Sequence, residues 1–435
     1  MAVVNLRKSE VKKIIGNKKD EEIDHTLSML SATVERIIND DVEVEIAPNR
    51  PDMLSEQGVL RALRSFTGKK KGLAEIEINK SGYQLIVEKS LPKNYPYGIA
   101  CIVKGLKLDD DKIKEIIDIQ EKIGTILLRK RKKGGIGFYP LNKISFPVRL
   151  RGLNPTEIKF RPLEFPKEIN AKQILSQHPT GREYSHLLKE WDKYPVFIDA
   201  KNTIISMPPV INSQDVGKID VNASDVFIEV TGVDYNLLKK IINIIIFALF
   251  DMGGKVYSID CIQSNGKKET IPNVSPEKIK LSIENTNKLI GLNLKEKEIK
   301  ELLERMGYSY NSNSEVLIPC YRADILHEVD LIEDIAIAYG YDKLIPEIPE
   351  ISTIGEIDKK EIIKTKISEI LIGLEFLETS SYHFVTKESV KKTNIPLREY
   401  TEVKSAKTDY TLLRNDLSLP LFKILSENID VEYPH

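Results

Sequence analysis

The sequence predicts a multidomain α+β protein, and three observations lead to that prediction. The chain has 435 residues, which at about 150 residues per domain corresponds to about three domains. Hydrophobic residues make up 41% of it and charged residues 30%, the balance of a folded protein rather than a disordered one. Short β-branched runs alternate with apolar patterns of helical spacing along most of the chain, which is typical of mixed α and β structure.

Residues 1–90 are predicted to form a small N-terminal α+β region. A helical pattern near Glu21–Ser31 precedes a strand pattern at Val42–Ile46. The turn Pro48–Asp52 follows it. The Asp52 side chain is expected to cap the next helix, because aspartate accepts hydrogen bonds from the free backbone N–H groups of a first turn.

Residues 91–265 are predicted to form an α+β domain with a sizeable core. Strands are favoured where β-branched residues gather, at Val196–Asp199, Thr203–Ser206, Val226–Val230 and Val256–Ile262. Between the last two strands, Asp234 is expected to cap an apolar helix that Gly253 ends.

Two further regions complete the chain. Residues 270–346 are predicted to be a compact unit with a strand at 278–282, helices opening at Asn285 and Leu294, a strand at 315–319 and a helix at 326–339. Residues 350–435 follow a linker rich in Pro and Ile, and they contain a helical pattern near Lys360–Ile372.

Composition excludes several classes of protein. The chain carries 64 Lys and Arg against 65 Asp and Glu, so an anionic partner must be met by a local basic patch. Its 3 cysteines lie far apart, which argues against a structural zinc or a disulfide scaffold and favours a cytoplasmic location. The longest apolar run, Ile241–Phe250, is about half of the roughly 20 residues that a membrane helix needs, so no membrane partner is expected.

The sharpest cluster of candidate functional residues is acidic. Asp330, Glu333 and Asp334 share one face of a predicted helix, and Asp324 precedes them in the chain. Like charges at this spacing repel by roughly 0.2–0.5 kcal/mol per pair, so a cation would stabilise them, and carboxylate oxygens suit Mg²⁺. A solvated acidic face, helped by the helix dipole, is the alternative.

A basic run forms a second candidate. Between Arg129 and Arg151 the chain has basic residues and no acidic one. Gly134 and Gly135 follow the cluster Arg129–Lys133, which predicts a mobile loop entering a strand. This loop could approach a phosphate backbone, or it could be an ordinary solvated loop.

A polar set beside two prolines forms a third candidate. Pro208 and Pro209 fix a rigid loop that presents Ser206 and Asn212, and Glu229 lies on the next predicted strand. These groups could hold a small amino acid or a water molecule. A turn with local side-chain hydrogen bonds is the simpler alternative.

Four blocks of the sequence carry more information than spacing alone. They are Val44–Ser55, Ser206–Asn212, Val226–Asp234 and Pro319–Tyr341. In this order they closely resemble the β subunit of phenylalanyl-tRNA synthetases, in the form found in archaea and in the eukaryotic cytosol. The blocks span nearly the whole chain, so coincidence does not explain them.

The resemblance implies an α₂β₂ enzyme that activates phenylalanine with ATP and attaches it to tRNA-Phe. It places the aminoacylation site in the α subunit, and no class II motif for holding ATP is found in this sequence. The β subunit would supply an editing domain at 91–265 that hydrolyses mischarged Tyr-tRNA-Phe. It would also supply a winged-helix-like domain at 270–346 and an incomplete class II catalytic-like domain at 350–435.

The resemblance also assigns individual residues. It places Mg²⁺ ligands on Asp324, Asp330, Glu333 and Asp334, and an editing pocket on Ser206, Asn212 and Glu229. At position 229 an aspartate is more usual in the family. A pocket that hydrogen-bonds the tyrosine hydroxyl offers phenylalanine nothing, which is the favourable direction for discrimination.

Two other functions are open alternatives at this point. The chain could be a stand-alone aminoacyl-tRNA deacylase, or a non-catalytic scaffold that binds tRNA. Family members continue for roughly another hundred residues, a length typical of a further domain. The resemblance therefore implies a truncated product or fragment that stops at Glu432–His435, where a further strand is expected.

Overall fold

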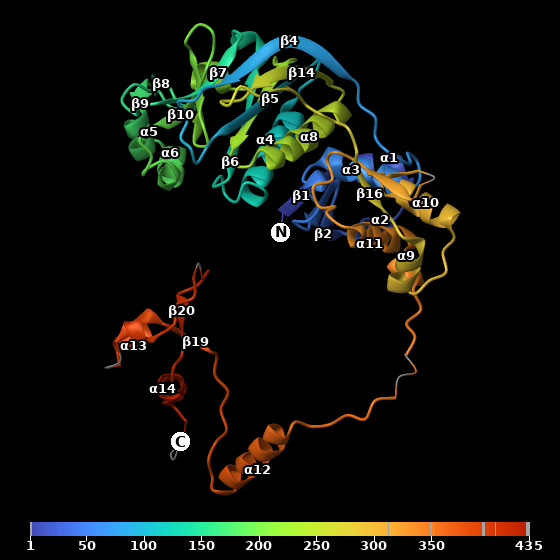
Figure 1. Cartoon of the computed structure of the whole chain (residues 1–435), viewed down its shortest axis with the longest axis vertical. Coiled ribbons are helices and arrows are strands. Elements are labelled where there is room, and N and C mark those ends of the chain that lie inside the picture. Colours follow the sequence, from blue (N-terminus) through green and yellow to red (C-terminus); the bar gives the residue numbers. More distant parts are fainter. Residues whose placement is uncertain are drawn as a thin grey trace. The chain divides into compact units, whose positions relative to one another are not determined.

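The computed structural model describes residues 2–311, 313–348, 350, 352–393, 396–404 and 406–431. The chain divides into two compact units, Met1–Ile345 and Pro346–His435, and each is described by itself (Figure 1). The division falls where the sequence predicts a linker. Residues 432–435, where a further strand is expected, lie outside the described residues.

A three-stranded antiparallel sheet opens the first unit. Its strand order is β1 (Ala2–Arg7), β3 (Asp41–Ile46) and β2 (Ala32–Ile38). The helices of this region are α1 (Lys8–Ile15), α2 (Asp20–Met29), the 3₁₀ turn η1 (Pro51–Met53) and α3 (Glu56–Phe66). The predicted helix near 21–31 and the predicted strand at 42–46 correspond to α2 and β3.

The predicted cap of α3 is wrong. The 3₁₀ turn occupies Asp52, so the α-helix begins later, and Ser55 Oγ accepts the hydrogen bond from Gly58 N at 3.0 Å. Asp52 is instead 3% exposed and pairs with Arg50, Nη2 to Oδ2 at 2.8 Å. A residue expected to stabilise a local helix end is therefore part of a buried ion pair.

A ten-stranded sheet dominates the described part of this unit. Its order is β12 (Ile211–Asn212), β11 (Ile204–Met207), β10 (Tyr194–Ile198), β7 (Val148–Leu153), β4 (Ile78–Val87), β14 (Lys255–Ile262), β5 (Tyr97–Lys104), β13 (Val226–Gly232) and β6 (Gly134–Pro140), with β15 (Lys268–Ile271) on β14. The four predicted strands correspond to β10, β11, β13 and β14. Because β4 and β15 belong to this sheet, the predicted boundaries at 91 and 265 are too narrow.

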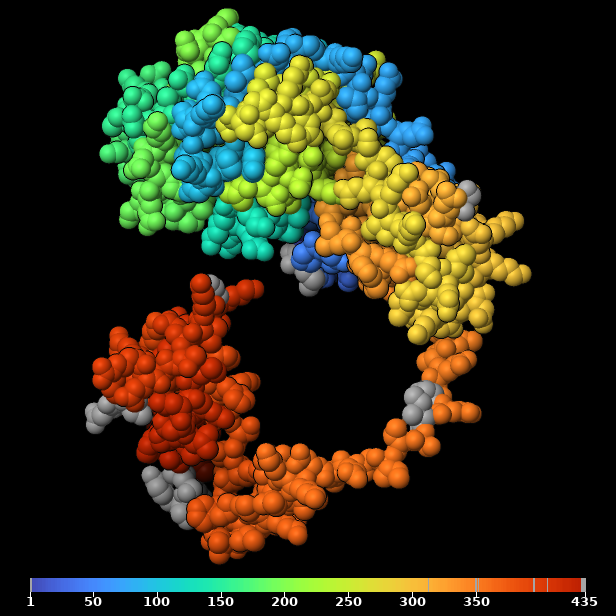
Figure 2. Space-filling model, in the orientation of Figure 1, coloured from blue at the N-terminus to red at the C-terminus, as the bar shows by residue number. Residues whose placement is uncertain are grey.

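Strand β4 pairs in parallel with both of its neighbours, β14 and β7, whereas the other pairs are antiparallel. Figure 2 shows the light-blue surface of the β4 region beside the yellow surface around β14, although these segments are far apart in sequence. In the middle of the sheet, the first strand in chain order, β4, therefore lies beside β14, the last but one.

Helix α8 (Tyr235–Asp251) lies against β5 and β13 and is buried along most of its length. Asp234 Oδ1 accepts hydrogen bonds from Asn236 N at 3.0 Å and Leu237 N at 3.2 Å, which confirms the predicted cap. Gly253, at φ +97°, follows the helix in a conformation that favours glycine. In the described part of the chain, no helix is both long and apolar enough to cross a membrane.

Smaller elements surround the sheet. They are α4 (Asp110–Ile126), η2 (Leu141–Lys143), β8 (Lys159–Phe160), β9 (Ile169–Asn170), α5 (Ala171–Gln177), α6 (Pro179–Tyr184), η3 (Ser185–Leu187) and α7 (Gln214–Gly217). Residues from β8, β9 and α5 form a second apolar core with β10 and β11.

The last part of the first unit packs three α-helices and a 3₁₀ turn with a three-stranded sheet. The strands are β16 (Glu277–Lys280), β18 (Glu315–Ile318) and β17 (Ser309–Tyr310), and the helices are α9 (Ile283–Ile290), α10 (Glu296–Arg305), α11 (Glu328–Tyr339) and η4 (Tyr341–Lys343). Helix α9 begins before the predicted Asn285, because Ser282 Oγ caps it by accepting from Asn285 N at 3.1 Å.

The second unit has few buried side chains. Its elements are α12 (Lys359–Gly373), β19 (Phe384–Thr386), α13 (Lys387–Lys391), η5 (Leu397–Glu399), β20 (Tyr410–Leu413) and α14 (Ser418–Glu427). Helix α12, which corresponds to the predicted helix near 360–372, buries none of its residues. A small core of Val385, Val390, Tyr400 and Leu412 holds the β19–β20 pair to the segments around it.

Candidate functional site

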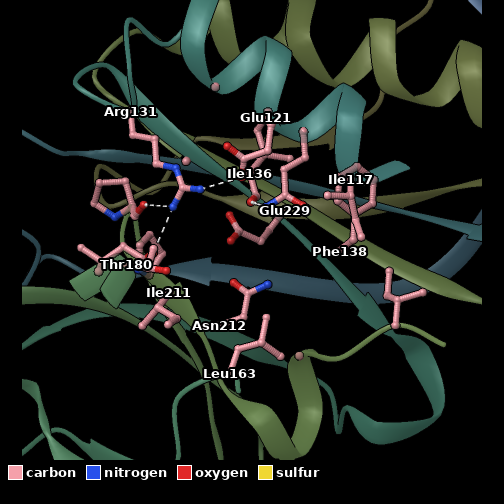
Figure 3. Close-up of a pocket in the computed structure, with 18 of the residues that line it drawn as sticks. Ile117, Glu121, Arg131, Ile136, Phe138, Leu163, Thr180, Ile211, Asn212 and Glu229 are labelled. Atoms are coloured by element: carbon pink, nitrogen blue, oxygen red, sulfur yellow. Dashed lines mark hydrogen bonds and ion pairs between the residues drawn. The ribbon is translucent and has the colours of Figure 1, made fainter. Parts of the chain in front are cut away.

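A cavity of about 390 Å³ lies where the two ends of the ten-stranded sheet meet. Strand β6 is at one end of the strand order and β12 at the other. Tyr139 on β6 donates toward Asn212 Oδ1 on β12 at 3.1 Å, so the sheet curves far enough to bring its ends into contact. The cavity is thus closed by residues distant in sequence, and Figure 3 shows its lining.

The walls of the cavity are largely apolar. Ile116 and Ile117 come from α4, Ile136 and Phe138 from β6, and Leu163 from the segment after β8. Polar side chains also contribute to the lining, and two of them, Asn212 and Glu229, face one another across it (Figure 3). An apolar cavity with a few convergent polar groups is the usual form of a small-ligand site.

Glu229 is the most unusual of these polar groups. Its side chain lies on β13, is 2% exposed, and has Oε1 at 3.0 Å from Tyr139 Oη. Its other oxygen, Oε2, has no hydrogen-bond partner among the described residues. Burial raises the pKa of Glu229 to about 8, although the Tyr139 hydroxyl works in the opposite direction. The carboxyl group is therefore mostly neutral at pH 7, and its Oε2 is a buried oxygen without a partner in a residue that lines the cavity.

Glycines make room for this arrangement. Gly137 is the cross-strand neighbour of Glu229, and a Cβ on it would come within 2.0 Å of Tyr139 Oη and 2.6 Å of Glu229 Oε1. A Cβ on Gly217 would come within 2.7 Å of Asn212 Cβ. Glycine at these two positions lets the Tyr139, Glu229 and Asn212 side chains approach one another.

The predicted basic loop is a turn that the contacts of Arg131 hold in place. Arg129, Lys130 and Arg131 all have positive φ, between 51° and 61°, which costs free energy for residues other than glycine. The Arg131 guanidinium donates to Val210 O at 3.0 Å, pairs with Glu121 Oε1 at 2.8 Å (Figure 3), and lies over the Tyr184 ring. Arg131 also lines the cavity. The expectation of a mobile loop is therefore wrong at Arg131.

The three predicted pocket residues lie together around Tyr139. Asn212 and Glu229 line the cavity, whereas Ser206 is 1% exposed, pairs with Asn212 in the β11–β12 register, and is not part of the lining. Burial and the Glu229 charge raise the pKa of Tyr139 well above its usual range, and the nearby Ser206 hydroxyl opposes them. Sequence reasoning missed Tyr139, whose only signal was its place in the strand that follows the basic run.

The predicted metal ligands are not brought together. Asp324 accepts from Arg322 Nε at 2.9 Å and Nη2 at 2.7 Å, and Asp334 pairs with Arg322 Nη1 at 2.7 Å. Asp330 Oδ2 accepts from the backbone N–H groups of Leu326 and His327, both at 2.8 Å. These contacts occupy the carboxylates that a metal would need.

The remaining predicted ligand, Glu333, is exposed. Among the residues that the structure describes, no three His, Cys, Asp or Glu side chains form a group that could hold a metal ion. The cation beside this acidic helix is the Arg322 guanidinium, which is 2% exposed. The four-carboxylate set, as predicted for Mg²⁺, does not fit an ion in this arrangement.

Comparison with known proteins identifies the family. A protein named phenylalanine–tRNA ligase beta subunit from Archaeoglobus fulgidus is 36% identical, over 100% of this chain and 80% of the relative. A protein of the same name from Pyrococcus furiosus is 33% identical, with 100% and 80% covered. The chain belongs to the phenylalanine–tRNA ligase beta subunit family. This confirms the predicted resemblance.

Two further comparisons agree with membership of the beta subunit family. Residues 279–341 match the family described as tRNA synthetase B5 domain. An N-terminal fragment of the phenylalanyl-tRNA synthetase β-subunit from Pyrococcus horikoshii superposes with a TM-score of 0.74 at 33% identity, covering 78% of this chain and 100% of the fragment. The predicted multidomain α+β class is confirmed, and a ligase subunit of this family has a role in tRNA aminoacylation.

Proposed function

We propose that this chain is the editing subunit of a phenylalanine–tRNA ligase, and that the cavity at the β6–β12 closure binds the tyrosyl group of mischarged Tyr-tRNA-Phe for hydrolysis. The observation that carries the proposal is the buried, unpartnered Oε2 of Glu229, a residue that lines the cavity. Aminoacylation with phenylalanine and ATP belongs, in this proposal, to the α subunit of an α₂β₂ complex.

The free oxygen gives a physical reason for selecting tyrosine. The phenolic hydroxyl of a tyrosyl group can donate a hydrogen bond to Glu229 Oε2, whereas phenylalanine leaves that buried oxygen unpaired. An unmade hydrogen bond to a buried polar group costs about 1–3 kcal/mol. Sites that pair a substrate hydroxyl reject the analogue without it more strongly than apolar pockets separate similar shapes.

The hydrolytic step itself needs only water and the ester. Water adds to the tyrosyl carbonyl carbon, the bond from that carbon to the ribose oxygen breaks, and tyrosine and uncharged tRNA leave. In this scheme Asn212 and Glu229 bind and orient the amino acid, and the apolar residues of the lining pack against its side chain.

Exposed groups elsewhere support the expected partners. Helix α12 presents apolar side chains to solvent, among them Ile363, Ile367 and Ile370, and such a patch is typical of a surface covered by another protein chain. We assign it to the α subunit. Exposed Arg129 and Lys130, beside the cavity-lining Arg131, are available to the phosphates of a tRNA end.

Magnesium has no part in this proposal. An ion at the acidic helix would have to displace the Arg322 guanidinium from Asp324 and Asp334. The structure of the chain gives no reason for that exchange.

A deacylation assay tests the proposal. The full chain, with and without the α subunit, is incubated with Tyr-tRNA-Phe and Phe-tRNA-Phe, and release of the amino acid is followed. We expect faster loss of tyrosine, and Asn212→Ala should slow it without unfolding the chain. Activity without α identifies a stand-alone deacylase, and no deacylation in either form identifies a non-catalytic tRNA-binding scaffold and rejects the proposal.

A second assay tests the division of labour. The isolated chain should catalyse no phenylalanine-dependent exchange of pyrophosphate into ATP, because that reaction is assigned to the α subunit. Exchange above background by the isolated chain would contradict the assignment.

A further inference from the structure

One hydroxyl connects the polar groups of the cavity, and it has one proton to give. Tyr139 Oη lies 3.0 Å from Glu229 Oε1 and 3.1 Å from Asn212 Oδ1. Both of those atoms are hydrogen-bond acceptors when the carboxyl group is ionised. A tyrosine hydroxyl donates only one hydrogen bond. In one of the two contacts, the Tyr139 oxygen must therefore accept a proton that its partner donates.

A neutral Glu229 supplies that proton. The carboxyl O–H at Oε1 donates to Tyr139 Oη, and Tyr139 in turn donates to Asn212 Oδ1. Both contacts are then satisfied, and the carbonyl-type oxygen Oε2 is the one left free in the cavity. Burial favours this state, because a neutral carboxyl group costs less to hold away from water than a charged one.

The surrounding strands hold the phenol in this place. Tyr139 is fully buried, and its ring packs at a tilt against Phe227, with ring centroids 5.9 Å apart. The hydroxyl extends along β6 over Gly137, in the space that a Cβ would occupy. The ring therefore has little freedom to move away from Glu229.

We propose that Tyr139 is a positioning residue for the editing reaction: by bonding both Glu229 and Asn212, its hydroxyl fixes which oxygen of Glu229 faces the cavity and so sets the preference for tyrosine over phenylalanine. The inference rests on the proposed function. It adds a residue that is expected to touch the two ligand-binding side chains rather than the substrate.

Tyr139→Phe in the full chain with the α subunit tests this role. The ring and its packing remain, but Glu229 loses its anchor and can turn Oε1 or Oε2 to either side. We expect kcat/KM for Tyr-tRNA-Phe to fall about tenfold, the value of one hydrogen bond, chiefly through KM. The slow deacylation of Phe-tRNA-Phe should stay the same, so that the preference falls by the same factor.

A matched control separates positioning from general loss of stability. Tyr308 is another fully buried tyrosine whose hydroxyl bonds a carboxylate, Asp334, outside the cavity. Tyr308→Phe should lower thermal stability and leave the preference for tyrosine unchanged. Gly137→Ala provides a second approach, because it keeps the hydroxyl in the chain but pushes it from its place, and it should reduce the preference as Tyr139→Phe does.

The outcomes separate this inference from the function on which it rests. Wild-type selectivity in folded Tyr139→Phe, or in folded Gly137→Ala, overturns the positioning role while the editing proposal stands. An equal loss of selectivity in Tyr308→Phe also overturns it, because the effect would then be general. If the wild-type complex does not deacylate Tyr-tRNA-Phe, the proposed function itself fails.

Discussion

Two buried acidic side chains, Asp334 and Glu229, each form a hydrogen bond with a buried tyrosine, but only Asp334 also pairs with an arginine. Asp334 on α11 is 4% exposed and Glu229 on β13 is 2% exposed, and each is bonded by a buried tyrosine hydroxyl, from Tyr308 and Tyr139. Asp334 also pairs with Arg322, whereas the second oxygen of Glu229 has no partner in the described structure.

The difference shows how a structural acid is told from a ligand-binding one. A buried charge that is paired on every side holds elements together and has nothing left for a substrate. Burying an acid whose second oxygen has no hydrogen bond costs free energy, and a ligand that bonds this oxygen would offset the cost. By this criterion we interpret the acidic helix as structural and propose Glu229 as the ligand-binding acid.

The largest effect is expected when the complete pairing is broken. Asp334→Asn removes one of the two carboxylates that pair with the buried Arg322 and leaves Asp324 as its remaining partner, so the loss should be at most the roughly 3–5 kcal/mol of a broken buried pair. Thermal and urea unfolding of the full chain would measure the loss. Glu333→Gln, on the exposed side of the same helix, is the control and should leave stability unchanged.

Magnesium sharpens the same experiment. We expect the ion to shift the melting temperature of wild type and Asp334→Asn equally, because the Arg322 guanidinium already occupies the place beside Asp324 and Asp334. A shift in wild type that disappears in Asp334→Asn would contradict the comparison and support the predicted metal site instead.

The next effect concerns the pH dependence of stability. Glu229 has its pKa raised from 4.5 to about 8 in the folded state, so the folded chain keeps a proton that the unfolded chain releases. Stability should therefore fall as pH rises from about 4.5 to about 8. With about 1.4 kcal/mol for each pKa unit, the loss is of the order of a few kcal/mol.

Glu229→Gln isolates that contribution. The amide cannot ionise, so the free energy of unfolding should fall less steeply with pH in the variant than in wild type. Urea unfolding at several pH values between 5 and 8 measures both slopes. Parallel curves would show that Glu229 ionises normally, and the contrast with Asp334 would lose its basis.

The free oxygen should decide selectivity. Glu229→Ala removes it and should lower the preference for Tyr-tRNA-Phe over Phe-tRNA-Phe by up to about a hundredfold, which corresponds to the roughly 1–3 kcal/mol of an unpaired buried polar group. Glu229→Gln should keep most of it, because its Nε2 can donate to Tyr139 and its oxygen can face the cavity. Deacylation rates of both variants measure the contrast, and a Gln variant as poor as Ala would show that the carboxyl acts in its charged form.

The smallest effect is expected at the rim of the cavity. Arg131→Ala removes donors to Pro209 O and Val210 O and the pair with Glu121, contacts worth about 1–2 kcal/mol because they are partly exposed. The loop before Asn212 should loosen, and deacylation should slow a few fold with little change in selectivity. Lys132→Ala, in the same turn, is the control and should match wild type.

Local patterns in the sequence predicted local structure well. The strand, cap and helix of residues 226–251 follow from β-branched residues, Asp234 and an apolar repeat, all within a short window. The prediction that Asp52 caps a helix was wrong, because the Asp52 carboxylate forms a buried ion pair with Arg50 instead. The partner strands of β4 could not be predicted, because they depend on residues far along the chain.

The site residues also divide into those that local sequence signals predicted and those that they did not. Asn212 and Glu229 were predicted as pocket residues from their resemblance and their polar character beside strands, whereas Tyr139 needs the closure of the sheet to reach them. The acidic helix was interpreted from Asp324 onward, and Arg322, two residues earlier, lay outside that window. Counting the charges of the flanking residues as well would have indicated an ion pair between Arg322 and the acidic residues.

The parallel pairing of β4 with β14 has a consequence for how the chain is made. Ser81 on β4 bonds Ser258 on β14, and 177 positions separate them. Contacts so far apart in sequence form slowly, and during synthesis β4 can pair with β7 but lacks its other neighbour until β14, which ends at Ile262, has left the ribosome. The residues that line the cavity end at Glu229, so they are synthesised before β14, and the unpaired edge of β4 depends on protection from aggregation until β14 follows.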